Sequence, residues 1–256
     1  MKPEADVPRR YACQRVATPI SIDGSLRDAG WIPLPWSEDF VDISGDGELR
    51  PPYRTRFKMG WDDRYLYVGA ELEEPHVWGT LTEQNSVIFN DNDFEVFIDP
   101  DGDGMNYYEF EINALGTIWE LSLPKPYGKG GVPVVGCNLP GLKCAVQVRG
   151  TLNDPTDRDD GWSVEVAFPW EALAKYNLGR RTPPASGDVW KMNFSRVQWK
   201  HELVDGQYQR IPPHGTLLAE SLNPEEQEHP EDNWVWSPQG AVNMHLPQHW
   251  GEVEFQ

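Results

Sequence analysis

The chain has 256 residues, a length that a single all-β domain can accommodate, and its 39% hydrophobic and 12% aromatic content exclude an intrinsically disordered protein. Its 41 acidic and 22 basic residues give a formal net charge of -19, which repels a phosphate backbone and gains nothing from an anionic membrane surface. No stretch approaches the roughly 18 apolar residues of a membrane-spanning helix. We therefore expect neither nucleic acid nor a membrane as a partner.

Short segments with apolar–polar alternation, separated by turn-forming residues, predict β-strands throughout the chain. They are Arg54 to Trp61, Tyr65 to Leu72, Asp93 to Asp99, Tyr107 to Asn113, Thr117 to Leu123, Lys143 to Arg149, Trp162 to Phe168, Asp188 to Val197 and Gly251 to Phe255. In Asp93 to Asp99 the alternation is typical of a half-buried antiparallel strand. Only Pro169 to Tyr176 predicts a helix, with proline at its start and Asn177 just past its end.

Many short strands with one short helix predict an all-β fold, a two-sheet antiparallel β-sandwich formed by residues 1–256 as one domain. Two long stretches, Pro124 to Gly136 and Lys200 to Asn233, are predicted as loops, and long loops on a rigid scaffold often hold ligands. Cys137 and Cys144 flank a turn-like NLPG segment, so they either form a disulfide or remain reduced thiols like Cys13.

Twelve tryptophans are more than one core of this size needs, so we expect some of them to be exposed. An indole plane packs on the C–H face of a sugar ring, while the sugar hydroxyls need polar partners. Tryptophans in long loops beside acids and amides therefore suggest a carbohydrate site. For any single tryptophan a core position remains the simpler interpretation, and Trp61 and Trp162 are assigned to the core.

The segment Asp99-Pro-Asp101-Gly-Asp103-Gly places three carboxylates at alternating positions. Such spacing can wrap oxygen ligands around Ca²⁺, so calcium is the expected cofactor. The segment lacks the glutamate at position 12 of an EF-hand and precedes a strand, which excludes that motif. A plain hairpin turn would have the same sequence pattern.

Four glutamates on predicted strands, Glu95, Glu109, Glu111 and Glu165, occupy positions where the paired carboxylates of a glycoside hydrolase could lie. The competing interpretation is that they are solvated or bind a cation. The chain contains no GxSxG, HExxH or phosphate-loop motif, so the usual markers of nucleophilic hydrolysis and zinc chemistry are missing.

Six segments, in order along nearly the whole chain, resemble carbohydrate-binding module family 9 and its family 9-like relatives. They are ISIDGSLRDAGW (Ile20 to Trp31), MGWDDRYLYVGAELEEPHVW (Met59 to Trp78), NDNDFEVFIDPDGDGMNYYEFEINALGTIWEL (Asn90 to Leu121), GWSVEVAFPWEAL (Gly161 to Leu173), WKMNFSRVQW (Trp190 to Trp199) and NWVWSPQGAVNMHLPQHWGEVEF (Asn233 to Phe255).

This resemblance implies a β-sandwich of the DOMON-like type, non-catalytic binding of a mono- or oligosaccharide between aromatic side chains, and structural calcium. By position, Trp78 and Trp199 are the implied aromatic pair. The implied hydroxyl partners are Arg196, Asn113, Glu95 and His245. The resemblance also implies a secreted or periplasmic bacterial protein, although MKPEADVPRR has no apolar signal region.

Two alternatives to a binding module remain at this stage. One is a glycan-active hydrolase that uses the strand-borne carboxylates. The other is a haem or redox module, because DOMON-like folds also carry haem. Its axial ligands would come from Met59, Met105, Met192, Met244 and His245.

Overall fold

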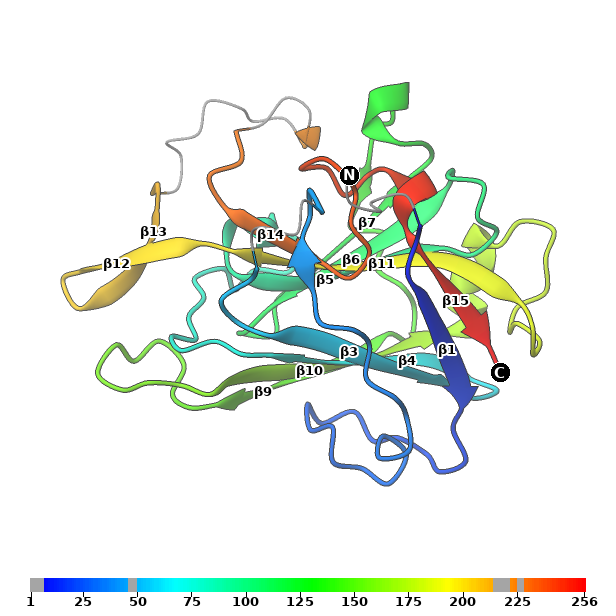
Figure 1. Cartoon of the computed structure of the whole chain (residues 1–256), viewed down its shortest axis with the longest axis horizontal. Coiled ribbons are helices and arrows are strands. Elements are labelled where there is room, and N and C mark those ends of the chain that lie inside the picture. Colours follow the sequence, from blue (N-terminus) through cyan, green and yellow to red (C-terminus); the bar gives the residue numbers. More distant parts are fainter. Residues whose placement is uncertain (1–6, 46–49, 214–221, 225–227) are drawn as a thin grey trace.

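The computed structural model describes residues 7–45, 50–213, 222–224 and 228–256, and its strands form two curved layers joined along one side (Figure 1). The first layer contains β2 (Val41–Asp42), β5 (Asp93–Asp99), β6 (Tyr107–Asn113), β7 (Ile118–Leu123), β8 (Val134–Val135), β11 (Val189–Gln198), β14 (Asp232–Val235) and β15 (Gly251–Phe255). The second layer contains β3 (Thr55–Trp61), β4 (Tyr65–Leu72), β9 (Lys143–Arg149) and β10 (Gly161–Pro169). A separate hairpin, β12 (Lys200–Val204) and β13 (Gln207–Ile211), projects from the end of β11.

The N-terminal strand β1 (Arg10–Arg15) joins the two layers into one sheet. Its first four residues pair in parallel with β15, and its last two, Gln14 and Arg15, pair in parallel with β3. The described strands therefore form a continuous 13-stranded mixed sheet that curls over itself. The prediction of a mostly β fold is confirmed, whereas the prediction of two separate antiparallel sheets is wrong. Alternation along a strand reports which face is buried, but it carries no information about which distant strand becomes the neighbour.

The predicted strands agree closely with the structure. Tyr65–Leu72, Asp93–Asp99 and Lys143–Arg149 have the expected bounds, and no predicted strand differs by more than one residue at either end. The predicted helix consists of one α-helical turn, α1 (Trp170–Leu173), followed by a 3₁₀ turn, Ala174–Tyr176.

The strands that the sequence did not predict are β1, β2, β8, β12, β13 and β14. Most of them are short or lie at an edge. Three of them, β8, β12 and β13, fall inside the stretches predicted as loops, and β14 begins where the second stretch ends. Residues 1–6, at the start of the chain, lie outside the described residues. So do residues 214–221 and 225–227, which belong to the second stretch predicted as a loop. Cys13, Cys137 and Cys144 are free thiols. No helix in the described ranges is long and apolar enough to cross a membrane.

Both faces of the main strands are buried, because apolar clusters lie between the layers and also outside each of them. The inner cluster joins Phe94 and Val96 of β5 to Val164 and Val166 of β10. The opposite face of β5 contributes Phe97 to a second cluster on the outside of the first layer. A third cluster covers the outside of the second layer beneath the segment that follows β1.

These clusters together accommodate almost all the tryptophans. Eleven of the twelve are buried, and Trp36 alone is half-buried, beneath the cationic groups of Arg56 and Lys58. Trp61 and Trp162 lie in the inner cluster as predicted. The expectation that several tryptophans are exposed is wrong, because it assumed one core where the chain forms several.

Glu165, one of the four candidate hydrolase carboxylates, has a structural role on β10. Its carboxylate accepts hydrogen bonds from the backbone N–H groups of Asp23 and Gly24, each at 2.7 Å, and from the indole N–H of Trp31 at 2.5 Å. Gly24 has φ +89, and a Cβ there would lie 2.6 Å from the backbone carbon of Val146. Glu165 therefore ties the segment after β1 onto the second layer.

Replacing Glu165 by alanine should destabilise the protein by several kcal/mol, because each buried donor left without an acceptor costs about 1–3 kcal/mol. Urea unfolding of Glu165→Ala measures the loss. The control is Glu254→Ala, at an exposed position on β15, which should change stability by less than about 0.5 kcal/mol. Equal stability of the two variants would contradict the anchoring role.

Candidate saccharide site

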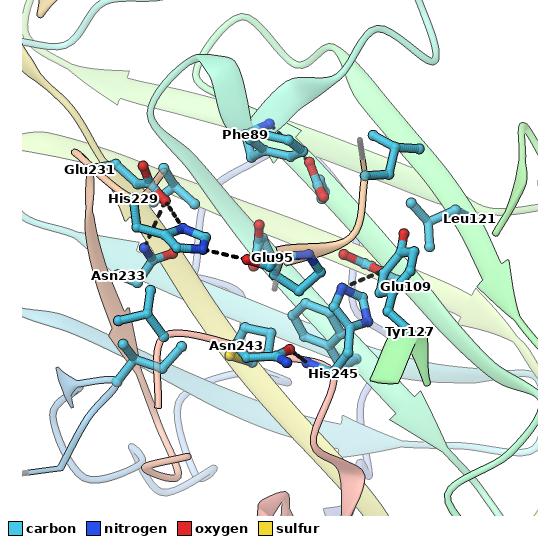
Figure 2. A pocket seen from close by; sticks show the side chains of 18 of the residues that line it. Phe89, Glu95, Glu109, Leu121, Tyr127, His229, Glu231, Asn233, Asn243 and His245 are labelled. Atoms are coloured by element: carbon cyan, nitrogen blue, oxygen red, sulfur yellow. Dashed lines mark hydrogen bonds and ion pairs between the residues drawn. The ribbon is translucent and has the colours of Figure 1, made fainter. Parts of the chain in front are cut away.

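A pocket lies on the outer face of the first layer, where side chains from adjacent strands form a row. In the strand register Glu95 of β5 is opposite Glu111 of β6, which is opposite Trp119 of β7. On the other side of Glu95 lies Ser195 of β11. Because directly opposite residues of antiparallel strands share a face, this register brings the side chains together. We call this cavity the acidic pocket (Figure 2).

The floor of the acidic pocket contains three buried carboxylates, Glu95, Glu109 and Glu111, and a fourth, Asp93, lies next to Glu95 and Glu111; none is more than 5% exposed. Burial raises the pKa of Glu95 to about 7, with a further contribution from the nearby Glu231 carboxylate. Burial, together with the charge of Glu95, raises the pKa of the other three well above the usual range. No lysine or arginine is among the described residues that line the cavity.

Aromatic side chains form the walls above this floor. Phe89 precedes β5, Trp119 lies on β7 and Tyr127 lies in the short 3₁₀ helix Tyr127–Lys129. The cavity volume is about 70 Å³, several times the ~10–15 Å³ that one water requires. The space therefore suits one end of a small polar ligand.

Two histidines border the pocket in different environments. His245 lies 2.9 Å from the hydroxyl of Tyr107 through Nδ1 and 3.9 Å from Glu109 through Nε2. Burial lowers the pKa of His245 to about 3, so its ring is neutral near pH 7. At the rim His229 contacts Glu231 at 2.8 Å, and this hydrogen bond raises the pKa of His229 (Figure 2). The two histidines therefore have pKa values shifted in opposite directions.

Several buried polar atoms around the pocket have no hydrogen-bond partner among the described residues. They include Asp93 Oδ2, Glu109 Oε2 and Trp119 Nε1. Buried polar groups are nearly always hydrogen-bonded, and leaving one unpaired costs about 1–3 kcal/mol. The site therefore presents both acceptors and a donor that a ligand can satisfy.

Of the six residues implied as sugar contacts, the structure places two in the acidic pocket. Glu95 belongs to its floor and His245 to its wall. Trp78 and Trp199 lie together but are only 1% and 2% exposed, in a cluster that includes Tyr208 of β13. The guanidinium of Arg210 stacks on Trp199 at 4.1 Å. A sugar could reach either indole ring only if the β12–β13 hairpin moved.

Trp199 acts on the pocket indirectly. Its indole N–H donates to the carbonyl of Phe89 at 2.8 Å, which positions an aromatic wall. The side chain of Asn113 is hydrogen-bonded within the protein: its amide N–H donates to the carbonyl of Leu81 and to Asp91, and its oxygen accepts from the backbone N–H groups of Leu115 and Thr117.

Arg196 is on the inner face of β11, opposite to the pocket. Its guanidinium is 2.6 Å from Glu74 and also donates to Gln198 and Thr55. Arg196 is completely buried, so this ion pair and these hydrogen bonds link Glu74, Thr55 and β11 inside the protein.

Arg196→Ala should reduce the free energy of unfolding by about 3–5 kcal/mol, because it leaves the Glu74 carboxylate buried and unpaired. Urea unfolding measures this effect. Arg56→Ala on β3 is a suitable control, since its pair with Glu71 is partly exposed and contributes only about 0–1 kcal/mol. A stable Arg196→Ala protein with impaired sugar binding would instead favour the role implied by the resemblance.

The three aspartates predicted to bind calcium form the tight β5–β6 connection. Asp99 accepts hydrogen bonds from the N–H groups of Gly102 and Gly104 at 3.0 and 2.8 Å, and both glycines have positive φ. Oxygens of Asp99, Asp101 and Asp103 lie within 4.8 Å of one another. The sequence therefore correctly identified their proximity, whereas calcium binding stays a prediction.

The raised pKa of Glu95 predicts how stability depends on pH. The folded-state pKa of Glu95, about 7, exceeds the ordinary 4.5, so the folded protein holds the Glu95 proton more tightly than the unfolded chain does. Ionisation of Glu95 therefore lowers the free energy of unfolding by about 3 kcal/mol as pH rises from 5 to 8. Urea unfolding in metal-free buffer at pH 5, 6, 7 and 8 should show stability falling with pH. Glu95→Gln should make the slope shallower, and an unchanged slope would contradict the assignment.

The pocket residues that sequence reasoning missed are Phe89, Trp119, Tyr127, His229 and Glu231, which come from separate segments. Glu109 and Glu111 were noticed only as possible hydrolase acids. The available signal was three glutamates at alternate positions on two consecutive predicted strands, which the register places on one face.

Residues 22–183 match the family model described as "Carbohydrate family 9 binding domain-like". The chain belongs to this family. The resemblance inferred from the six sequence segments is confirmed, and so is the class of function it implied, carbohydrate binding without catalysis.

The chain is similar to parts of larger enzymes. It is 25% identical over 171 residues to exoglucanase XynX of Acetivibrio thermocellus and 26% identical over 167 residues to endo-1,4-beta-xylanase A of Thermotoga maritima. The matches cover 66% and 63% of this chain but only 13% of each relative. The chain thus corresponds to a small part of those proteins.

Solved structures share the fold over the whole chain. A Bacteroides uniformis structure with a proposed carbohydrate-binding function has a TM-score of 0.66 at 16% identity, covering 98% of this chain and 100% of its own. A family 9 carbohydrate-binding module from Caldicellulosiruptor kristjanssonii, in complex with cellotriose, has a TM-score of 0.57 at 15% identity, covering 97% of this chain and 94% of its own. At these identities the likeness establishes the fold alone.

Proposed function

We propose that the acidic pocket binds one residue of a saccharide without cleaving it. The observation that carries this proposal is a small cavity with aromatic walls over carboxylates, in which buried acceptors and an indole donor have no partner in the described residues. A sugar hydroxyl both donates and accepts hydrogen bonds, and sugar C–H faces pack on aromatic rings. Cellotriose and glucose are bound by modules that share this fold, which makes β-glucans a reasonable first ligand class.

A hydrolase is disfavoured by the carboxylate geometry. Oxygens of Asp93, Glu95 and Glu111 lie within 4.8 Å of one another. Retaining glycosidases separate their two carboxyl groups by about 5–5.5 Å and inverting enzymes by about 6.5–9.5 Å. Carboxylates this close share a proton or a cation more readily than they flank a glycosidic bond. Glu165 is occupied by the segment after β1.

The residues proposed for haem do not form a haem site. Met59 and Met192 are fully buried in the inner cluster, on the face of the sheet opposite to the pocket. His245 and Met244 line the pocket, but one nitrogen of His245 contacts Tyr107 and the other faces Glu109. The anionic floor gives a porphyrin with its two propionates no favourable partner.

We also propose calcium binding by Asp99, Asp101 and Asp103, whose three carboxylates are close enough to share one ion. Such an ion would brace the β5–β6 connection next to the pocket. Export to the periplasm or the cell exterior is proposed from the similarity to polysaccharide-degrading enzymes.

Binding of glucose, cellotriose and xylo-oligosaccharides should be measured by isothermal titration calorimetry. Phe89→Ala should weaken saccharide binding at least about tenfold, because it removes a partly exposed wall that stacks on the sugar, a contribution of about 1–2 kcal/mol. The backbone carbonyl that orients Trp199 remains in this variant.

The matched control is Trp36→Ala, which removes the half-buried tryptophan outside the pocket and should leave affinity unchanged. Saccharide binding that survives Phe89→Ala but is lost in Trp36→Ala would place the site elsewhere. Absence of binding to a broad glycan array by the folded wild type would contradict the function itself.

A further inference from the structure

We propose that Asp93, Glu95 and Glu111 form a divalent-cation site at the floor of the acidic pocket, which Glu95 and Glu111 line, with the open side of the ion directed at the saccharide. This site is distinct from the Asp99–Asp103 loop. The cation site stands on its own geometry, whereas the contact between ion and sugar rests on the proposed function.

The geometry of the three carboxylates suits a metal ion. Each contributes one oxygen, and these oxygens lie within 4.8 Å of one another. Ca²⁺ takes oxygen ligands at about 2.3–2.6 Å, so ligands on opposite sides of the ion are about 5 Å apart. Glu95 and Glu111 are opposite each other in the β5–β6 register, and Asp93 is two residues before Glu95 on the same face. The rigid pairing of two strands therefore sets the spacing.

An unpartnered buried atom in this group gives independent support. Asp93 is completely buried and accepts one hydrogen bond through Oδ1, from the N–H of Val197 at 3.0 Å, while Oδ2 has no partner. This oxygen points to a missing positive ligand rather than to a satisfied polar network.

Within the described part of the chain, no lysine or arginine side chain lines the cavity. The buried guanidinium of Arg196 lies on the inner face of β11, where it is paired with the Glu74 carboxylate at 2.6 Å. His245 is neutral near pH 7, and His229 lies at the rim with Glu231. Buried carboxylates without a cation must otherwise take up protons, at the cost of their charge.

The ligand set favours a hard cation. It contains carboxylate oxygens and no thiolate, and such sets suit Ca²⁺, Mg²⁺ or Mn²⁺. Three carboxylates leave part of a six- to eight-fold Ca²⁺ shell open, and Glu95, Glu109 and Glu111 line the cavity. Two vicinal hydroxyls of a sugar can complete that shell, so the ion would link the acidic floor to a neutral ligand.

The test uses the full chain after removal of metals with EDTA. Thermal unfolding with added CaCl₂ measures ion binding, and Tb³⁺, which replaces Ca²⁺, reports its position through luminescence sensitised by tryptophan. Trp119 is directly opposite Glu111 in the register and can act as the donor. Glu111→Gln should weaken ion binding at least about tenfold. It also removes one of several repelling buried charges, so the metal-free variant should be at least as stable as the wild type.

Asp103→Asn in the β5–β6 connection is the matched control, because it alters the other acidic cluster and leaves the pocket intact. Tryptophan-sensitised Tb³⁺ luminescence that persists in Asp103→Asn but is lost in Glu111→Gln and Glu95→Gln would support the site, as would a Ca²⁺-induced rise in melting temperature that each of these variants reduces only in part. Ion binding that is unchanged in Glu111→Gln, or wholly lost in Asp103→Asn, would overturn it.

Saccharide titrations with CaCl₂ and with EDTA separate this inference from the proposed function. Binding that requires Ca²⁺ supports both. Equal saccharide binding in EDTA leaves the function standing and overturns the role of the ion. Ion binding without any saccharide binding supports the ion site and contradicts the function. If glucosamine binds the protein in EDTA and binds Glu111→Gln more weakly, the ammonium group of the sugar is the cation that the carboxylates bind. That result would overturn the metal site.

Discussion

Burial of both faces of the curled sheet is the constraint on which the rest of this structure depends. Strands β5, β6 and β10 have almost no exposed side chain, because apolar clusters lie between the layers and outside each of them. A polar residue at any position of these strands must therefore find a partner inside the protein or bind a ligand. This requirement separates the structural polar groups from the functional ones.

Two groups of buried charge show the contrast. Glu165 receives three N–H donors, and Arg196 is surrounded by Glu74, Gln198 and Thr55, so both are satisfied by the chain itself. The carboxylates of the acidic pocket face one another, and two of their oxygens have no partner within the described part of the chain. Burial, together with mutual repulsion, raises the pKa values of these carboxylates, so their ionisation lowers the stability of the folded protein as pH rises.

The aromatic residues follow the same division. Trp78 and Trp199 are the aromatic pair that the sequence resemblance implied for sugar binding, yet they pack beneath the β12–β13 hairpin. The indole N–H of Trp199 donates a hydrogen bond to the backbone carbonyl of Phe89. The pocket wall is built by Phe89, Trp119 and Tyr127 instead.

The sequence by itself determined the strands, the family and the acidic β5–β6 turn, because these depend on local periodicity, on turn chemistry at Gly102 and Gly104, and on motif order. It could not determine that β1 joins β15 to β3, that Arg196 and Glu95 lie on opposite faces, or that Trp78 is covered. Nor could it bring Phe89, Glu111 and His245 to one pocket. Those features depend on pairing between strands far apart in the chain, and the free energy of that pairing comes from burying surfaces that no single segment contains.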